Sequence, residues 1–362
     1  MKQLIFTVTN DLSYDQRMIR ICNSLANAGY NVLLIGRKKN SSVPLQPQSF
    51  KQKRLHCLFQ KGKWFYAEYN VRLFIYLLFK KTDLICAIDL DTILPCYRIS
   101  KLKGVKRVYD AHELFCEMKE VVSRPQIYKA WKKIEKRTVP NFKYGYTVCS
   151  PVANEFKKMY NVNYGVIMNA PVLSLLVVPE KKEKYILYQG SVNEGRSFET
   201  LIPAMRNVNS KLLIAGDGNF MEQVKQLVKE NKLEDKVVLV GKILPGELKN
   251  YTQQAYIGVT LFENKGLSNY YSLANRFFDY IHAGIPQLCV DFPSYQELNK
   301  EPIGILINDL TSENISRQLN RLLDDEALYK TLQANCMSAR EKFNWQNEEK
   351  KLLQFYQSVF QE

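Results

Sequence analysis

The side chains with the clearest chemical potential lie in the stretch Asn269–Pro286, NYYSLANRFFDYIHAGIP. Ser272 suits the N-cap of a helix, because its hydroxyl can accept a hydrogen bond from a backbone N–H of the first turn. Gly284 stands where a helix C-terminus favours a left-handed residue, and Pro286 prevents the helix from continuing. The pattern therefore predicts a loop, a short helix with a sharp stop, and then a buried strand over 287–290.

The start of this helix is suited to binding a diphosphate. The backbone N–H groups of a first turn and the positive end of the helix dipole together form an anion site. Ser272, Asn275 and Arg276 cluster there, and each could reach a phosphate oxygen. Asp279 lies one turn further on, on the face of Asn275, where a carboxylate could accept both hydroxyls of a ribose. An ordinary capped amphipathic helix explains the same pattern, and the local sequence alone favours that simpler explanation.

The run Ser272–Pro286 resembles the donor-site signature of the retaining glycosyltransferases of family 4, of the bacterial surface-polysaccharide type. These enzymes have the GT-B fold. One branch reads S-L-P-N-K-x-F-E-Y-x-x-A-G-x-P, and this chain has Ala274 for the Pro, Arg276 for the Lys and Asp279 for the Glu. The resemblance implies that this helix holds the nucleotide diphosphate and that the acid binds the ribose. The wider family has a second acid eight residues earlier, where this chain has Tyr271, which we therefore assign to the donor site.

The composition is that of an ordinary globular protein of two domains. The chain has 362 residues, and 46% of them are hydrophobic, which is enough for a sizeable core. The eight cysteines are scattered without a C-x-x-C pair, and the three histidines are dispersed. This argues against a disulfide framework or a metal cluster and for a reducing cytosol. Residues 1–9 are apolar but short, and they indicate a first strand rather than a signal peptide.

Charge is distributed unevenly along the chain. Residues 1–168 hold 29 Lys+Arg and 12 Asp+Glu, a net charge of +17, whereas residues 169–362 hold 22 and 24, a net charge of −2. A basic surface attracts phosphates, nucleic acid or anionic lipid. A basic domain that is merely soluble explains the bias equally well.

Strands and helices alternate in both halves, which is typical of βαβ units and parallel sheets. In the first half the predicted strands are 3–9, 31–36, 83–89 and 144–150, together with a strand and its loop over 106–115; the segment 37–60 is a loop with at most one weak strand. In the second half they are 185–190, 236–241, 255–262 and 287–290, together with a strand and its tight turn over 211–218. We therefore predict an α/β protein. The resemblance implies two Rossmann-like domains with parallel sheets facing across a cleft. It also implies their roles: an acceptor-binding domain over 1–168, a nucleotide-sugar-binding domain over 169–344, and a C-terminal helix, 345–362, that returns to the first domain. A charged linker is predicted over 178–184.

Further candidate residues follow strands of the first half. The loop 9–17 lies at the carboxyl end of the first strand, where doubly wound sheets bind ligands. The family uses this loop for the acceptor, so Asn10, Asp11 and Arg17 are candidate acceptor contacts, although a helix-capping Asp is the simpler explanation for Asp11. His112 directly follows the strand of the segment 106–115, in D-A-H-E. Family members often carry a histidine here, which implies a catalytic role for His112 in steadying a donor hydroxyl or developing charge.

Three more segments of the second half match the family in the right order. Gly190–Arg196 matches a pattern in which a strand, a glycine and a cation precede a helix; Ser197 stands where the family has glycine. In the family this segment helps to clasp the diphosphate, so Gly190 and Arg196 join the donor site. The segments 216–218 (GDG) and 240–248 also lie where the family has them.

The segment 61–81, KGKWFYAEYNVRLFIYLLFKK, has aromatic residues between basic flanks. Its apolar part is interrupted by Glu68, Asn70 and Arg72, which argues against a transmembrane helix. A helix at a membrane surface has this composition. A core helix of the first domain explains it slightly better, and both are compatible if one side is exposed.

The function that these observations favour is transfer of a hexosyl or other glycosyl group (EC 2.4) from a nucleotide-sugar to a lipid-linked or saccharide acceptor. The resemblance implies retention of configuration. The pair Asp89 and Asp91 has the spacing of a metal-binding D-x-D, but it lies far in sequence from the donor segments. A helix N-terminus with Arg196 and Arg276 could stabilise the leaving diphosphate instead. We therefore expect no metal and no cofactor, the nucleotide-sugar being a substrate.

The basic half favours a cytoplasmic protein that is peripheral on the anionic inner face of the plasma membrane. Two alternatives remain open at this stage. An epimerase or phosphorylase acting on nucleotide-sugars could use the same fold. A nucleic-acid-binding protein would account for the basic charge, but the sequence has no helix-turn-helix, finger or RNA-binding motif, so no nucleic acid is expected as a partner.

Overall fold

The computed structural model describes residues 1–176 and 184–361, and the chain forms two compact units. One unit comprises Met1–Asn169 together with Glu348–Glu362, and the other comprises Ala170–Asn347. The boundaries expected from sequence, after residues 168 and 344, lie one and three residues from these divisions. The predicted charged linker lies outside the described residues except for Lys184.

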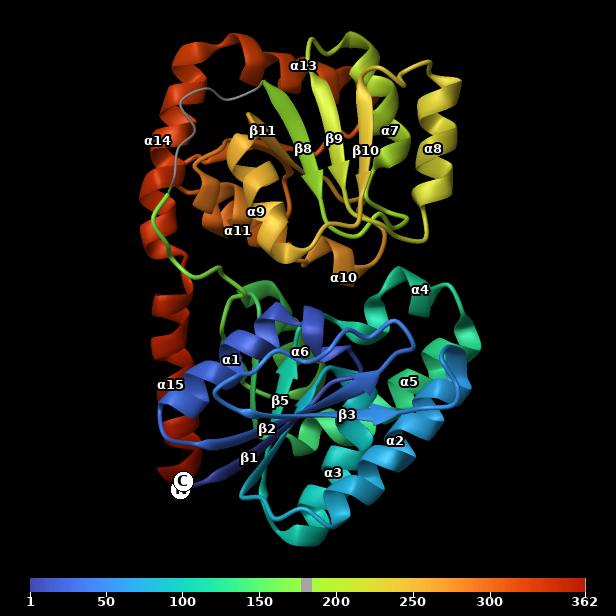
Figure 1. The fold of residues 1–362 in the computed structure, drawn as a ribbon, viewed down its shortest axis with the longest axis vertical. Helices are drawn as coiled ribbons and strands as arrows, with labels where there is room; N and C mark the ends of the chain where they lie inside the picture. The colour runs from blue at the N-terminus through green and yellow to red at the C-terminus, as the bar shows by residue number, and fades with distance from the viewer. Residues whose placement is uncertain (177–183, 362) are drawn as a thin grey trace. The chain divides into compact units, whose positions relative to one another are not determined.

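The first unit is built on a parallel sheet in the order β3-β2-β1-β4-β5-β6-β7 (Figure 1). Its strands are β1 (Gln3–Thr7), β2 (Asn31–Lys38), β3 (Lys51–His56), β4 (Leu84–Ile88), β5 (Lys106–Ala111), β6 (Tyr144–Thr147) and β7 (Gly165–Val166). Every residue of β4 is buried, as expected for a central strand that is covered on both faces. The order reverses beside β1, so the carboxyl ends of β1 and β4 adjoin at the point where such sheets bind ligands.

Helices cover both faces of this sheet. They are α1 (Gln16–Asn27), α2 (Gly62–Leu78), α3 (Ile93–Lys103), α4 (Lys119–Val122), α5 (Pro125–Thr138), α6 (Ser150–Tyr160) and the greater part of α15 (Trp345–Gln361). α2, α3 and α5 form one contacting group, and α15 lies on the side of α1 (Figure 1). The ring of Tyr356 in α15 packs 5.9 Å from Phe6 and 6.3 Å from Tyr146. The C-terminal helix therefore completes the core of the unit that the N-terminus begins.

The second unit repeats the design with a parallel sheet in the order β10-β9-β8-β11-β12-β13. Its strands are β8 (Tyr185–Gln189), β9 (Lys211–Ala215), β10 (Val237–Gly241), β11 (Ile257–Thr260), β12 (Gln287–Val290) and β13 (Gly304–Ile307). Its helices are α7 (Phe198–Ala204), α8 (Met221–Glu230), α9 (Pro245–Gln254), α10 (Leu267–Tyr270), α11 (Asn275–Ala283), α12 (Pro293–Leu298), α13 (Ser312–Asp324) and α14 (Glu326–Lys342). α7, α8 and α13 form one contacting group, and α9, α11 and α14 form another (Figure 1).

The predicted α/β architecture of two parallel-sheet units is confirmed. The expected strands are present, but most end one to several residues earlier than predicted, because the polar residues after each strand belong to loops at the carboxyl edge. β3, expected only as a weak strand, pairs with β2 over six residues. α5, β7 and β13 were not predicted from the sequence. Within the described ranges, no helix has both the length and the apolar character needed to cross a membrane.

Candidate functional site

α11 is fixed to its sheet by a tyrosine that fills the space above a glycine. The Tyr280 hydroxyl donates a hydrogen bond to the carbonyl of Leu187 in β8 (2.8 Å). A Cβ on Gly258 of β11 would lie 2.3 Å from the Tyr280 ring, so only glycine allows the helix to approach this closely. The approach places the first turn of α11 beside the carboxyl end of β8.

The predicted N-cap of α11 is wrong, whereas its predicted C-terminus is confirmed. The helix begins at Asn275 with Ala274 as N-cap residue, and no side chain caps it. The Ser272 hydroxyl instead donates to the carbonyl of Asn269 (2.8 Å) in the turn that follows the short helix α10. At the other end Gly284 adopts φ 64°, the left-handed conformation expected of a C-cap.

Arg276, in the first turn of α11, is a buried cation without an acid. Its residue is only 7% exposed, yet no salt bridge to it occurs among the described residues. One terminal nitrogen, Nη1, lies 3.5 Å from both the Tyr188 hydroxyl and the Gln189 carbonyl oxygen. Nε and Nη2 are buried and have no hydrogen-bond partner. Since an unpaired buried charge is costly, these two N–H groups indicate a place for an anion.

Arg196 lies close to Arg276. The guanidinium carbons of the two arginines lie 4.4 and 4.7 Å from the centroid of the Phe262 ring, so at most about 9 Å separates them. Nη1 of Arg196 donates to Oδ1 of Asn269 (3.1 Å), which holds its side chain in this position. Two like charges kept this close repel each other unless an anion lies between or beside them.

Glycines bring the backbone of two neighbouring loops together at this edge. Gly190 adopts φ 120°, and a Cβ there would lie 3.4 Å from Nη1 of Arg276. A Cβ on Gly216 would lie 1.8 Å from the Gly190 carbonyl oxygen, and one on Gly218 would lie 2.2 Å from that of Val192. Ser197, where the family has glycine, adopts the left-handed φ of 57° and is buried. Here the chain accepts backbone strain that glycine avoids.

Asp279 is oriented by a residue that the sequence did not reveal. Nε2 of Gln189 donates to Oδ2 of Asp279 (2.8 Å), and Oε1 of Gln189 accepts from the Thr252 hydroxyl (2.7 Å). Gln189 is buried at the end of β8. This hydrogen bond fixes the orientation of the Asp279 carboxylate.

The remaining donor-site candidates lie on the surface of the same region. Asn275 is exposed at the first position of α11. Tyr271 and Ser272 are half-buried in the loop between α10 and α11, and the Tyr271 carbonyl accepts from the Ser294 hydroxyl (2.9 Å). Thus Gly190, Arg196, Arg276 and Asp279 are linked through direct contacts or shared neighbours, while Asn275, Tyr271 and Ser272 border them.

In the first unit, His112 is held between two carboxylates. Its backbone N–H donates to Oδ1 of Asp89 (2.9 Å), its Nδ1 lies 3.3 Å from Oδ2 of the same residue, and its Nε2 lies 3.3 Å from Oδ2 of Asp110. Burial alone would lower the pKa of His112, but Asp89 and Asp110 outweigh it and raise the pKa to about 9. The side chain is 23% exposed. Both ring nitrogens already have partners within the unit, so the predicted catalytic hydrogen bond to a donor hydroxyl requires one of these contacts to be exchanged.

Arg17 belongs to this network rather than to a free acceptor surface. Its guanidinium donates to Oδ1 of Asp110 (3.0 Å) and to the Ile167 carbonyl (3.0 Å), and its Nε lies 3.1 Å from Nε2 of His112. Arg17 and Asp110 are both buried. In this conformation the Arg17 guanidinium is engaged within the unit, and the acceptor contact expected of Arg17 stays a prediction.

The carboxylate of Asp11 also has partners within its own unit, and one of these contacts is a cap, as the simpler explanation for Asp11 predicted. It caps a turn by accepting from the backbone N–H of Ser13, and it pairs with Arg54 (3.2 Å) and the Ser42 hydroxyl. Burial would raise the pKa of Asp11, but these hydrogen bonds and the Arg54 charge hold it below its usual value. The side chain of Asn10 donates to Asp15 (3.1 Å) in an exposed position, so a contact with an acceptor there stays a prediction.

Asp89 and Asp91, the D-x-D pair, flank the same edge. Asp89 adopts φ 54°, a strained conformation for a residue other than glycine. Burial first, and the charge of Asp89 second, raise the pKa of Asp91 to about 7. Among residues 1–176 and 184–361, no group of three or more His, Cys, Asp or Glu side chains is arranged to hold a metal ion. The metal independence of the chain stays a prediction.

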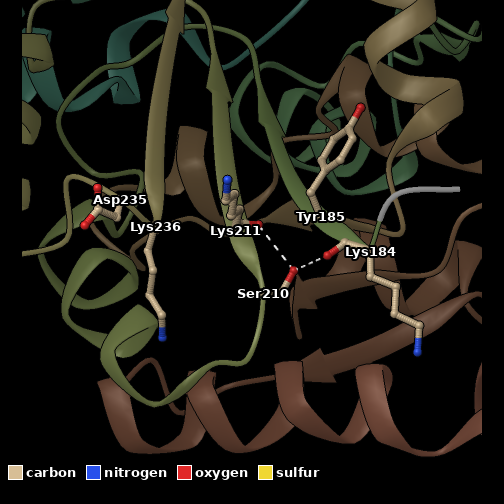
Figure 2. Close-up of a pocket in the computed structure, with 6 residues that line it drawn as sticks. All are labelled: Lys184, Tyr185, Ser210, Lys211, Asp235 and Lys236. Carbon is tan, nitrogen blue, oxygen red and sulfur yellow. Dashed lines mark hydrogen bonds between the residues drawn. The ribbon is translucent and has the colours of Figure 1, made fainter.

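A separate hollow of the second unit lies at the opposite edge of its sheet. It is lined by residues at the starts of β8, β9 and β10, namely Lys184, Tyr185, Ser210, Lys211, Asp235 and Lys236. Figure 2 shows the lysine side chains pointing away from one another, and Nζ of Lys236 donates to three backbone carbonyls of residues 205–208. The lysines therefore do not converge on a common anion.

Sequence reasoning missed Gln189, Phe262 and Asn269. Each supports a predicted residue: Gln189 orients Asp279, Phe262 lies under both arginines, and Asn269 holds Arg196. A polar Gln at the end of an otherwise apolar strand was a usable signal. Nothing in the local sequence distinguished Phe262 from a core residue.

Comparison with known proteins shows that the second unit is similar to a recognised family. Residues 177–339 match the family described as Glycosyl transferases group 1. An uncharacterized glycosyltransferase, MJ1607, from Methanocaldococcus jannaschii is 26% identical over 182 residues, 48% of this chain and 45% of that protein. N-acetylgalactosamine-N,N'-diacetylbacillosaminyl-diphospho-undecaprenol 4-alpha-N-acetylgalactosaminyltransferase from Campylobacter jejuni is 25% identical over 45% of this chain and 44% of that protein. The chain thus spans about half the length of the curated relatives that it matches.

Solved structures match over the whole chain. Sucrose-phosphate synthase from Thermosynechococcus elongatus superimposes with a TM-score of 0.82 at 19% identity, covering 99% of both chains. Anabaena Alr3699/HepE in complex with UDP-glucose gives a TM-score of 0.78 at 11% identity, covering 99% of this chain and 100% of that one. The chain therefore has the GT-B fold of two Rossmann-like domains, as expected.

Proposed function

We propose that this chain is a glycosyltransferase that moves a sugar from a nucleotide-sugar donor to a lipid-linked or saccharide acceptor, with retention and without a metal. The observation that carries the proposal is Arg276, a buried cation with two unpartnered N–H groups at the first turn of a helix. The family match over residues 177–339 supports it, because the match includes this helix. Anabaena Alr3699/HepE, which has the same fold, is known in complex with UDP-glucose.

In this proposal the second unit binds the donor and stabilises its leaving group. Arg276 and Arg196 contact the diphosphate, and its negative charge grows as the bond to the sugar breaks. Fixed cations in a water-poor site stabilise that charge without reorganising, so they do the electrostatic work that other enzymes assign to a metal ion. Asp279, oriented by Gln189, accepts the ribose hydroxyls.

The acceptor and the location are inferred from charge and from relatives. The first half carries a net charge of +17, which favours a phosphorylated or lipid-linked acceptor and a peripheral position on the inner, cytoplasmic face of the plasma membrane. The Campylobacter jejuni relative is named for a diphospho-undecaprenol substrate. No resident cofactor is required, since the nucleotide-sugar is consumed as a substrate.

Thermal unfolding with a panel of UDP, GDP, CMP, ADP and NAD tests the donor site. A nucleotide at about 100 times its dissociation constant adds roughly 2.7 kcal/mol to the free energy of unfolding. We expect one nucleoside diphosphate to raise the melting temperature of the second unit, with EDTA present or absent. Arg196→Ala should weaken the binding of that nucleotide by about tenfold or more, because the substitution removes a charge-assisted contact of about 1.5–3 kcal/mol.

Arg206→Ala is the matched control, since Arg206 is an exposed arginine of the same unit. Equal nucleotide affinity in Arg196→Ala and the wild type would remove Arg196 from the site. Consumption of a nucleotide-sugar in the absence of any acceptor would favour an epimerase or phosphorylase instead. Binding of random DNA or RNA in a gel shift, followed across salt, would favour a nucleic-acid partner.

A further inference from the structure

α2 has two apolar faces, and only one of them is covered. Phe65, Tyr69, Leu73 and Leu77 recur at helical spacing and are buried against the first unit. On the opposite face Trp64, Val71, Ile75 and Leu78 recur at intervals of seven, four and three residues, and they are 60%, 59%, 51% and 37% exposed. The expectation of a core helix is therefore met on one face only. We call these four residues the outer stripe of α2.

The exposed apolar surface extends past both ends of the helix. Leu58 and Phe59 precede it, Phe79 follows it, and all three side chains are exposed. The rings of Phe59 and Trp64 lie 6.2 Å apart, so the outer stripe is continuous with the loop before it. Single exposed apolar residues are normal on a soluble protein, but a row of them along one face of a helix, interrupted only at Glu68, marks an interaction surface.

The charges around the outer stripe are almost all positive. Residues 58–81 contain Lys61, Lys63, Arg72, Lys80 and Lys81 but a single acid, Glu68. Glu68 accepts hydrogen bonds from the backbone N–H groups of Leu58 and Phe59 and from Arg72, so its charge is used locally. Within residues 58–81, the four lysines therefore stand at the two ends of an apolar row, and the segment has no second acid.

We propose that the outer stripe of α2 docks on an anionic lipid bilayer, with the helix lying parallel to the membrane surface. Apolar side chains at this spacing would enter the boundary between headgroups and acyl chains, while lysines at both ends contact the phosphates. Lys63 lies over the Trp64 ring (5.4 Å) and Lys80 over the Tyr76 ring (5.0 Å), so both ammonium groups already lie next to the aromatic rings of the helix.

The positive charge around the outer stripe favours an anionic bilayer over a second copy of the chain as the binding partner. A second copy would bring its own lysines against these, because the symmetric contact of a homodimer pairs the same surface with itself. A bilayer containing anionic lipid supplies both the apolar layer and the negative charge. The docking needs neither nucleotide nor acceptor, so its test is independent of the donor site.

Vesicle flotation with the full-length chain tests the proposal. The probes are vesicles of phosphatidylcholine alone and vesicles of phosphatidylcholine with a minority of phosphatidylglycerol. We expect binding to the anionic vesicles and loss of that binding as salt is raised. Val71→Ser combined with Ile75→Ser should weaken binding by about tenfold or more, because affinity for the interface scales with the apolar area inserted. Lys80→Gln combined with Lys81→Gln should weaken binding and reduce its dependence on salt.

Two matched controls separate this face from general surface effects. Val238→Ser with Leu244→Ser changes two exposed apolar residues of the second unit, and Lys229→Gln with Lys300→Gln changes two exposed lysines there. Both should bind vesicles like the wild type. Wild-type binding by the stripe variant would overturn the proposal, as would equal binding to neutral vesicles. If the stripe variant instead changes the sedimentation mass of the free protein and leaves vesicle binding intact, a second copy covers the face and the proposal is wrong.

Discussion

At the scale of single residues, His112 shows how a buried network sets a protonation state. Asp89 and Asp110 raise the pKa of its imidazole to about 9 against the effect of burial. With this pKa, the imidazolium donates from Nδ1 to Asp89 and from Nε2 to Asp110; the neutral ring would instead accept from Arg17 at Nε2. The charged form is therefore the one present at neutral pH.

The raised pKa of His112 predicts a pH-dependent contribution to stability. The contribution is fully present below about 6.5, the ordinary histidine value, and is lost as pH rises through about 9. We expect His112→Gln to cost up to about 3 kcal/mol of unfolding free energy at pH 6, and the difference from wild type to shrink towards pH 10. Denaturant unfolding at a series of pH values measures it. His56→Gln, at an exposed histidine, is the control; a difference that stays constant with pH would show that His112 is not charged in the folded state.

The residues of the donor region could be predicted from sequence only where the chemistry lies in a local motif. Arg276 and Asp279 share one short helix, so spacing alone brought them together. Gln189 ends β8 and Phe262 lies just after β11, and their contacts with these residues depend on strand order, which the sequence did not reveal. Ser272 was assigned to the cap because its type is favourable, but the turn after α10 provides it with another acceptor.

At the scale of elements, the loops after β8 and β9 approach each other so closely that no side chain fits between their backbones. The backbone of Gly216 passes so close to Gly190 that a Cβ would lie 1.8 Å from its carbonyl oxygen. Gly216→Ala should therefore destabilise the second unit by more than about 2 kcal/mol, since two backbone segments must separate. It should also weaken nucleotide binding, because the loop at Gly190 contacts Arg276.

The matched control for Gly216 is Gly246→Ala in the first turn of α9. A Cβ there meets no atom within 4 Å, and alanine favours a helix by about 0.8–1.0 kcal/mol over glycine. Melting temperatures with and without nucleotide should fall for Gly216→Ala and rise slightly for Gly246→Ala. Equal effects of the two substitutions would contradict the close approach of these loops.

Helices and strands could be predicted because the spacing of apolar residues indicates which positions are buried. The same spacing does not show whether a second apolar face is covered or exposed to solvent. The central strands were found as apolar runs, since they are covered on both faces. α2 was expected mainly as a core helix, and its outer stripe became visible only once the buried face was known. α5 was missed because its basic, exposed surface leaves few buried positions to mark a period.

At the scale of the whole molecule, one unit is formed by a continuous segment of the chain and the other by two separate segments. The second unit closes within Ala170–Asn347, whereas the first requires Glu348–Glu362 from the other end of the sequence. In α15 Leu352, Tyr356 and Val359 are buried. A carboxylate oxygen of Glu348 accepts the backbone N–H of Met168 (2.7 Å). The return of this helix, suggested by family resemblance, thus has a physical reason in the core that it completes.

A chain truncated after Asn347 should therefore lose the cooperative unfolding of the first unit and keep that of the second. Three buried side chains at about 1.5–3 kcal/mol each amount to a large part of the 5–15 kcal/mol that stabilises a typical domain. Calorimetry should show one transition in place of two, and the remaining one should still rise with the nucleotide that stabilises the full chain. Tyr356→Phe keeps the ring and removes only the hydroxyl contact with Tyr146 (3.3 Å), so it should retain both transitions. If the truncated chain keeps both transitions, α15 is dispensable for the first unit. If truncation abolishes the rise in melting temperature with nucleotide, the donor site is not contained in the second unit.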